Sequence, residues 1–377
     1  MKRNLTTWES ACIITGYGVG AGVLSMPYLA EKNGFITATL ILIAAFAASF
    51  VLHLMIADLA LKAGPGEQII SCLSRFLFRG KLKKFLELLF FVLMGLILIT
   101  NLAAYIEGAQ EIIVGLLPIP PIVAVILFYA VAAVVVLLGL KAVGVSEKLA
   151  VTVIFCLIGA LAVASCFAEH SPVPLFGGSF NQILAYFGLA MFAMSAFFSV
   201  PQAVEGLGGD VKKIKKAVCL GLLNNFILIF VISFCAIWAS KEVTEVAMVG
   251  WSSGIGLWAQ IIGSLFTVLA MLTTYWSLSL ALGGIVQDAL KLGDRAAWLI
   301  ATLPSLILSL CGFSGFMELM RTAGGLIAIV IAVMIVPAYH NARREVEGSI
   351  LNRGGPVTEV LIIIAYVLMA VGSVVSY

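Results

Sequence analysis

Apolar runs long enough to cross a lipid bilayer recur along the whole of this chain of 377 residues. Of its residues, 62% are hydrophobic and only 11% are charged. That composition excludes a soluble enzyme and is typical of a membrane protein with many spans. Because a helix satisfies its own backbone hydrogen bonds within lipid, we predict an all-α polytopic membrane protein.

Hydrophobic periodicity and length predict eleven transmembrane helices. A basic amphipathic stretch at residues 66–82 is expected to lie along the membrane surface. Extramembrane loops are expected at residues 169–181 and around Trp251-Ser252-Ser253-Gly254. The predicted spans are residues 8–30, 34–61, 85–116, 121–140, 148–167, 182–207, 216–239, 257–289, 296–311, 316–339 and 357–376.

The basic residues support this count of spans. With the N-terminus in the cytoplasm, 19 of the 22 lysines and arginines fall on the inner side. Only Lys32, Lys241 and Arg321 fall outside. A miscounted span would scramble that asymmetry. We therefore predict a protein of the cytoplasmic (plasma) membrane, with its N-terminus inside and its C-terminus outside.

Glycine occupies every second position from Gly16 to Gly22 in the first span, and Pro27 follows. Each glycine weakens a helix by roughly 1 kcal/mol relative to alanine, and proline removes a backbone donor. The helix is therefore expected to break here, and in lipid a break is tolerated only where it lines a cavity or is buried in protein. The same spacing also suits close helix packing of the GxxxG type, and this stretch alone favours neither explanation.

The sixth span contains a second irregular stretch. Residues 192–201 are rich in small residues and end in Pro201, and a lysine cluster follows at 212–216. With five spans per half, spans one and six occupy matching places in halves of opposite orientation. We expect residues 1–167 and 182–340 to form two inverted five-helix repeats, with 341–377 adding an eleventh helix. Two interrupted helices at matching positions indicate a secondary transporter.

The run from Gly18 to Tyr28 resembles the first-helix signature of the amino acid/auxin permease family, which belongs to the amino acid–polyamine–organocation superfamily with its LeuT fold. The stretch from Phe187 to Ala193, Pro201 and the following lysine-rich loop are similar to that family's sixth helix. Spore-germination permeases share a similar first-helix motif. At Ser195-Ala196-Phe197 this chain departs from the Gly-Gly-His-like run of many members, which puts the usual substrate preference in question.

The resemblance implies that an amino acid binds between the two breaks. Backbone N–H groups of the first break would hold its carboxylate, and carbonyls near residues 192–195 its ammonium group. Asn101 and Tyr105 of span three could reach the same pocket. The residues implied for substrate binding are Gly18, Val19, Gly20, Ala21, Gly22, Phe192, Ala193, Met194, Ser195, Phe198, Asn101 and Tyr105.

For the coupling ion, the resemblance implies a sodium site made by Thr273, Thr274 and the carbonyls near Gly18 and Ala21. The two hydroxyls could instead bond the carbonyl one turn back in their own helix. Some proton-coupled relatives carry a lysine in span five, where this chain has apolar Ile154, and this difference favours sodium. Glu107 in span three is the alternative proton-coupling residue. His53 is expected to be a hydrogen-bonded interior residue.

The expected function is import of a small, neutral amino acid by cation symport, with sodium favoured over protons. The alternative is a permease homologue that binds an amino acid and signals without net transport, as a germinant receptor does. The sequence has no catalytic constellation and no nucleotide-binding motif, so it predicts neither an enzyme nor an ATP-driven pump. Its seven cysteines are scattered singly and suggest no metal or redox site, so no cofactor beyond the coupling ion is expected. The expected partners are the amino acid substrate and membrane lipid, and no nucleic acid.

Overall fold

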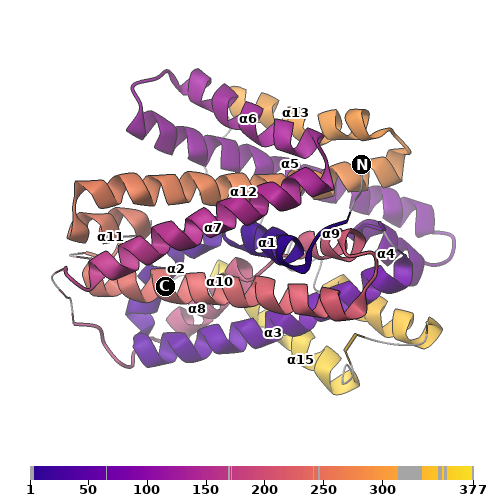
Figure 1. The fold of residues 1–377 in the computed structure, drawn as a ribbon. Coiled ribbons are helices and arrows are strands. Elements are labelled where there is room, and N and C mark those ends of the chain that lie inside the picture. Colours follow the sequence, from indigo (N-terminus) through magenta and orange to yellow (C-terminus); the bar gives the residue numbers. More distant parts are fainter. Residues whose placement is uncertain are drawn as a thin grey trace.

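All regular secondary structure in the described residues is helical, as Figure 1 shows. The structure is a computed structural model, and it describes residues 4–375 except 65, 169, 171, 241, 245–246, 313–332, 347–349 and 352–354. Six of these helices are long and apolar enough to cross a membrane, or seven if one bent pair counts as a single span. The expectation of an all-α polytopic membrane protein is therefore confirmed. Most of the predicted span 316–339 lies outside the described residues. Residues 333–345, which are described, are helical.

In chain order the helices are α1 (Thr7–Gly18), α2 (Ala21–Asn33), α3 (Phe35–Ala63), α4 (Ile69–Phe76), α5 (Lys83–Leu116), α6 (Pro121–Leu137), α7 (Leu140–Ser165), α8 (Phe180–Ala193), α9 (Ser199–Gly206), α10 (Val211–Ala239), α11 (Ala247–Ile255), α12 (Leu257–Leu290), α13 (Asp294–Leu310) and α15 (Pro356–Val374). Spans one and six are each divided into two helices, as predicted. The boundary between the two five-helix halves stays a prediction.

Two predicted boundaries were wrong. The fifth span was expected at 148–167, but α7 begins at Leu140, directly after Gly139 with a φ of 88°. Glycine allows that turn without steric cost, so the helix starts two turns early and includes Lys141 and Lys148. The loop expected around Trp251 contains helix α11. Helix α11 is attached to the end of α7, because the buried Trp251 indole N–H donates to Ser165 Oγ at 2.7 Å.

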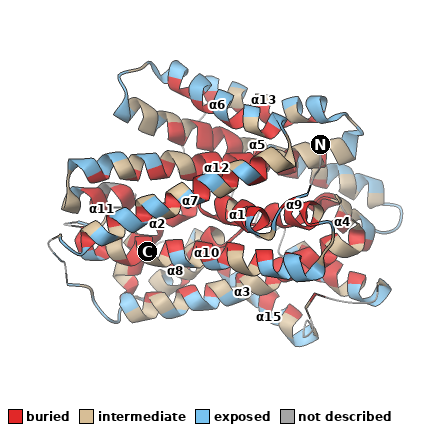
Figure 2. Cartoon of the chain, in the orientation of Figure 1, coloured by how far each residue is buried: buried red, intermediate tan, exposed pale blue. Residues whose placement is uncertain are grey.

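The broken helices lie between two groups of helices. One group is made by α5, α6, α12 and α13, which pack on one another, and the other by α3, α8, α10 and α15. Figure 1 shows α1 and α9 between these groups, with α7 crossing the face that is turned to the viewer. In Figure 2 the helices with the largest buried share are the central ones, while α6 and the outer turns of α5 and α15 are exposed. The interrupted backbone is thus surrounded by protein.

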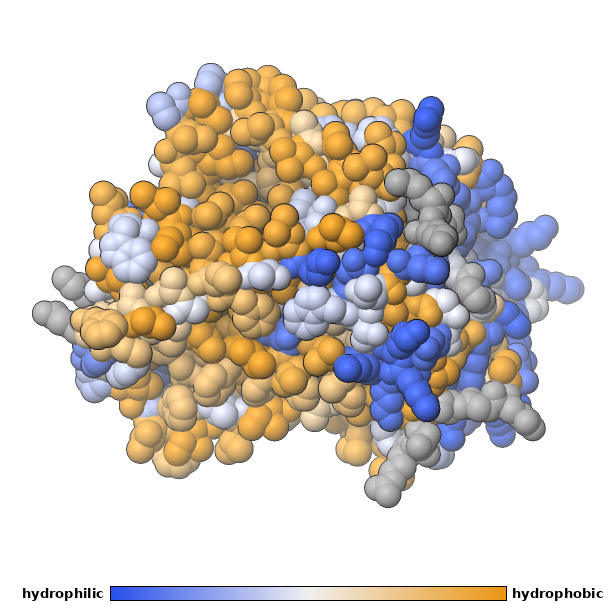
Figure 3. Space-filling model, in the orientation of Figure 1, coloured by the Kyte–Doolittle hydropathy of each residue, from blue (hydrophilic) through white to orange (hydrophobic). Residues whose placement is uncertain are grey.

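Polar and apolar side chains are separated along the length of the bundle. Figure 3 shows an apolar surface over most of the molecule and hydrophilic residues gathered towards one end, where Figure 1 places the N-terminus and α4. The exposed apolar residues of α6, such as Ile122, Ile126 and Val134, belong to the apolar belt. The belt is the surface expected to face lipid.

The last helix packs closely on the second broken helix. A Cβ at Gly372 of α15 would lie 2.2 Å from the Leu184 carbonyl oxygen of α8, and one at Gly188 would lie 3.0 Å from the Gly372 carbonyl carbon. Earlier in α15, Tyr366 lies beside Phe197, with ring centroids 6.0 Å apart. Small residues that let two backbones approach are typical of helix contacts in membranes. Helix α15 therefore supports α8, the first half of the second broken span.

Membrane orientation can be tested with single cysteines in a variant whose seven native cysteines are replaced by serine or alanine. We expect Lys213→Cys, at the exposed start of α10, to resist an impermeant maleimide in right-side-out vesicles and to react after permeabilisation. Phe176→Cys, exposed in the loop before α8, should react in intact vesicles. The opposite pattern would reverse the orientation inferred from the basic residues.

Candidate functional site

The first break lies between Gly18 and Ala21, where the axes of α1 and α2 differ by 62°. Gly20 is the N-cap of α2, and no side chain caps its first N–H groups. A helix N-terminus carries a partial positive charge and several free donors, which suit an anion. The break therefore points an uncapped helix start into the protein interior.

Neighbouring side chains explain why this start must be glycine. A Cβ at Gly20 would lie 2.8 Å from the Tyr105 hydroxyl of α5 and 3.1 Å from Thr274 Oγ1 of α12. A Cβ at Gly22 would lie 3.0 Å from the Cα atom of Ala193, at the end of α8. The glycine run thus serves both purposes that the sequence left open, because it breaks the helix and admits neighbours close to the backbone.

The second break, residues 194–198, is held by two polar residues of α3. Ser49 Oγ donates to the Met194 carbonyl at 3.0 Å, and His53 Nε2 accepts from the Ala196 N–H at 2.9 Å. His53 Nδ1 lies 2.7 Å from the Ser49 carbonyl, which assigns the ring proton to Nδ1 and leaves Nε2 free to accept. The expectation that His53 is a hydrogen-bonded interior residue is confirmed, and its partner is the backbone of the second break.

The two breaks face each other. Gly22 contacts both Ala193 and Phe192, and the rings of Tyr17 and Phe198 lie 6.4 Å apart across the junction. One break offers uncapped N–H groups at the start of α2, and the other offers the backbone at the end of α8. Donors and acceptors so arranged can bind the two charged ends of an amino acid, with aromatic rings beside its side chain.

Some residues predicted for the site lie together, and others do not. Val19, Ala193 and Met194 are buried at the two breaks, and Tyr105 lies against Gly20. Gly18 faces α10, because a Cβ there would lie 1.9 Å from Asn225 Nδ2. Asn101 donates back to the Ile97 carbonyl of its own helix, and Ser195 Oγ donates to the Met191 carbonyl. Those two side chains satisfy their own helices and have no described contact across the site.

The predicted threonine pair divides in the same way. Thr274 Oγ1 lies 3.0 Å from the Ala270 carbonyl of its own helix, and also 3.1 Å from the Gly16 carbonyl and 3.4 Å from the Tyr17 carbonyl at the end of α1. Thr273 Oγ1 donates to the Ala270 carbonyl of its own helix. The α1 carbonyls that meet Thr274 are thus those of Gly16 and Tyr17, which directly precede the expected Gly18, and the carbonyl of Ala21 is not among them. Ala21 is the first residue of α2.

Besides Glu107, which the sequence predicted, a second carboxyl group lies next to the end of α1, and it was not identified from the sequence. Glu147 of α7 is fully buried, and its Oε1 accepts from Ser277 Oγ at 2.8 Å. Gln202 of α9 donates to the Ser277 carbonyl at 2.9 Å. The predicted proton residue Glu107 is half-buried in α5, and among the described residues no hydrogen-bond partner for its Oε1 is found. The signal that could have revealed Glu147 was the continuous helical pattern from Leu140, which places it inside a span.

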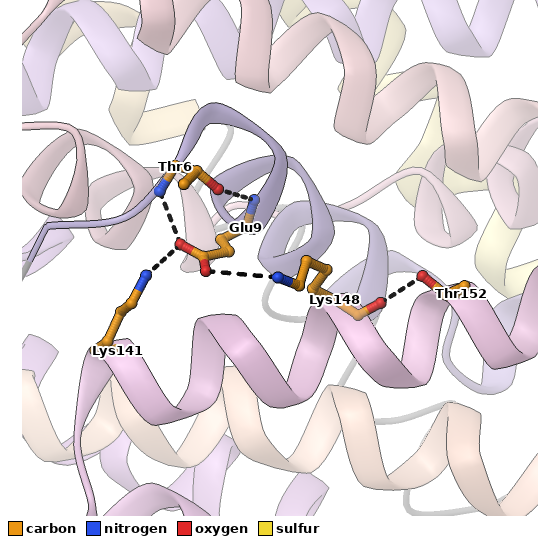
Figure 4. Close-up of polar contacts among 5 residues, drawn as sticks. All are labelled: Thr6, Glu9, Lys141, Lys148 and Thr152. Atoms are coloured by element: carbon orange, nitrogen blue, oxygen red, sulfur yellow. Dashed lines mark hydrogen bonds and ion pairs between the residues drawn. The ribbon is translucent and has the colours of Figure 1, made fainter.

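Near the hydrophilic end, a cluster of charged residues holds the start of α1 on α7, as drawn in Figure 4. Thr6 and Glu9 form a capping box, in which Glu9 Oε2 accepts from the Thr6 N–H at 2.8 Å. The same oxygen lies 2.6 Å from Lys141 Nζ, and Glu9 Oε1 lies 3.9 Å from Lys148 Nζ. The charge of the buried Glu9 carboxylate is therefore compensated on both oxygens.

Two interrupted helices that meet between two helix groups define the class of the protein as a membrane protein of the LeuT fold. Two solved structures share this fold. One is Mhp1, a nucleobase-cation-symport-1 family transporter in a closed conformation with bromovinylhydantoin bound, at 11% identity and a TM-score of 0.66, covering 99% of this chain and 91% of that chain. The other is MhsT in complex with L-phenylalanine, at 14% identity and a TM-score of 0.65, covering 99% and 100%.

The sequence model of the tryptophan/tyrosine permease family matches residues 3–373, and the chain belongs to that family. This supports the expected LeuT-fold transporter and replaces the amino acid/auxin permease family suggested by the first-helix motif. No curated protein sequence matches the chain. The protein is thus a multi-pass membrane transporter of the permease type.

Changing Gly20 to valine tests the meeting of the two breaks. Its branched side chain would collide with the Tyr105 hydroxyl and Thr274 Oγ1, so we expect substrate affinity to fall more than about tenfold, or about 1.4 kcal/mol. The matched control is Gly159→Val in α7, where nothing lies within 4 Å of an added Cβ. Binding is measured by scintillation proximity on purified protein of equal thermal stability. A well-folded Gly20→Val protein with unchanged affinity would place the site elsewhere.

Proposed function

We propose that this protein imports an aromatic amino acid by cation symport, with the substrate bound between the two broken helices. The observation that carries the proposal is the contact between the start of α2 and the end of α8, made by Gly22 against Ala193 and Phe192. This contact brings the uncapped N–H groups at the start of α2 close to the backbone carbonyls at the end of α8. The description of the family as tryptophan/tyrosine permeases and the L-phenylalanine complex of MhsT support the aromatic class.

The binding arrangement follows from the chemistry of the breaks. The substrate carboxylate would accept hydrogen bonds from the first N–H groups of α2, where the helix dipole favours negative charge. Its ammonium group would meet the carbonyl end of α8. Its ring would lie beside Tyr17, Phe198 and Phe192, where offset or edge contacts between aromatic rings are worth about 0.5–1.5 kcal/mol each beyond burial. This proposal narrows the small neutral amino acid expected from the sequence.

The coupling cation belongs to the same proposal. The sequence favours sodium, and the oxygens that meet at the end of α1 are the Thr274 hydroxyl and the Gly16 and Tyr17 carbonyls, which are ligands of the hard-cation type. Protons are the other candidate, and they require a titrating side chain. A receptor-like homologue that binds but does not transport would share the binding site, so transport has to be measured directly.

Uptake into liposomes tests the function. We expect the purified protein to exchange external radiolabelled L-tryptophan, L-tyrosine or L-phenylalanine for the same internal amino acid. Exchange should exceed that of L-alanine or L-leucine at least tenfold, because only the aromatic substrates fill the ring contacts. A protein that binds these amino acids in a thermal-shift assay and exchanges none of them would be a sensor.

The two threonines of α12 provide a matched pair for the end of α1. Thr274→Val removes a hydroxyl within hydrogen-bond distance of two α1 carbonyls as well as the Ala270 carbonyl of its own helix, so we expect tryptophan binding to weaken about three- to tenfold. Thr273→Val removes one that bonds its own helix and should change binding less than about twofold. Tryptophan binding by the wild type and both variants is then measured against sodium concentration at fixed pH. Sodium stimulation that Thr274→Val abolishes would establish the sodium site expected from the sequence.

A further inference from the structure

Glu147 is a buried carboxyl group without the compensation that Glu9 receives. It is fully buried, it has no ion pair within the described part of the chain, and its Oε2 has no hydrogen-bond partner there. Its one described partner is the Ser277 hydroxyl, which donates to Oε1. An ionised carboxylate can only accept hydrogen bonds, and a buried charge with a single neutral donor costs several kcal/mol. The packing around Glu147 therefore favours the neutral, protonated acid.

The position of Glu147 links it to the first break. A Cβ at Gly16 would lie 1.9 Å from Glu147 Oε2, so the carboxyl rests directly on the last turn of α1. The Gly16 carbonyl in turn accepts from Thr274. Ser277 also lies 3.4 Å from the Ile13 carbonyl, which ties the same carboxyl contact to the preceding turn of α1. Any tilt of α1 away from α7 and α12 would change what the carboxyl touches.

Glu147 is also connected to the second broken span. Gln202 of α9 donates to the backbone carbonyl of Ser277, whose hydroxyl donates to Glu147. Helices α1, α7 and α12 therefore meet at this carboxyl, and α9, the second half of the second broken span, is connected to it through Ser277. A proton there can therefore influence both broken helices.

The ionisable groups around Glu147 are few. On α1 these are the buried Cys12 thiol and Glu9, which is paired with Lys141 and Lys148 of α7. The other ionisable groups on helices packed against α7 are Tyr17 of α1, Tyr129 of α6, Glu205 of α9, Cys219, Cys235 and the lysines at the start of α10, and Tyr275 and Asp288 of α12. In the described residues no cation lies within 4 Å of the Glu147 carboxyl. Its charge state is thus set by local hydrogen bonds and by access of water.

We propose that Glu147 is the proton-coupling site of the transporter, resting on the proposed amino acid symport. One proton binds the carboxylate to form the neutral acid and later leaves as the same proton, with no other bond changed. The neutral acid matches the observed contact between α1, α7 and α12. Release requires water to reach the carboxyl, which happens when α1 separates from α7 on the cytoplasmic side. Substrate release and proton release then require the same opening.

The experiment uses the full-length protein in liposomes. We expect wild-type protein to accumulate radiolabelled L-tryptophan under an inward proton gradient without sodium, and to acidify vesicles loaded with a pH-sensitive dye. Glu147→Gln, which keeps the shape and cannot release a proton, should lower gradient-driven accumulation at least tenfold. Its tryptophan exchange should continue with a rate that no longer changes between about pH 5.5 and about pH 8. The matched control is Glu111→Gln, at an exposed carboxyl of α5.

Several outcomes would overturn the proposal. One is gradient-driven accumulation by Glu147→Gln at the wild-type level. Another is a loss of gradient-driven accumulation in Glu107→Gln but not in Glu147→Gln. Accumulation that needs sodium and ignores pH would make Glu147 a sodium ligand or a structural residue. If the wild type exchanges none of the three aromatic amino acids, the proposed substrate fails, and this result is seen before any variant is compared.

An infrared measurement tests the protonation of Glu147 independently of transport. The carbonyl stretch of a protonated carboxyl should be present in the wild type and Glu111→Gln near neutral pH and missing in Glu147→Gln. Ser277→Ala, which removes the single donor, should shift that band without abolishing it. An identical band in the wild type and Glu147→Gln would show that Glu147 carries no proton and would overturn the proposal whatever the substrate is.

Discussion

Hydrogen bonding of the interrupted backbone is the constraint on which the rest of this structure depends. An unsatisfied N–H or C=O group within the membrane costs several kcal/mol, so each break needs partners from other helices. Thr274 of α12 supplies a donor for the end of α1, and Ser49 and His53 of α3 supply a donor and an acceptor for the second break. These partners come from both groups of helices, which fixes the breaks between them. The start of α2 is different, because no side chain caps it.

The alternating glycines of the first span let three different neighbours approach the backbone. Gly16 faces the Glu147 carboxyl, Gly18 faces Asn225 and Gly20 faces the Tyr105 hydroxyl. All three neighbours are polar, and they come from α7, α10 and α5. A GxxxG motif that served only helix packing would bring backbones or apolar side chains to these positions. The polar neighbours instead place hydrogen-bonding groups along the irregular turn, where a bound molecule or ion would need them.

The spans and both breaks could be predicted from the sequence because local composition determines them. Hydrophobic length gives the spans, and glycine or proline weakens the helix where it breaks. Glu147 was missed because the predicted fifth span begins at Lys148, whereas the helix begins at Leu140, directly after Gly139. The partner of His53 is Ala196, 143 positions away, and Thr274 meets Gly16 rather than Gly18. Such pairings depend on how helices cross, which no local pattern records.

The two buried carboxyl groups between α1 and α7 differ in how their charge is balanced. Glu9 is held by two lysines and the Thr6 N–H, so its negative charge is stable where it lies. Glu147 contacts α1 at Gly16, seven residues or about 10 Å farther along the helix, and has one hydroxyl donor. Separating α1 from α7 would expose both groups to water, but only Glu147 would gain a more stable charged form. The pair Glu9–Lys141 therefore holds the helices together, and under the proposed proton coupling a loss of the proton from Glu147 would favour their separation.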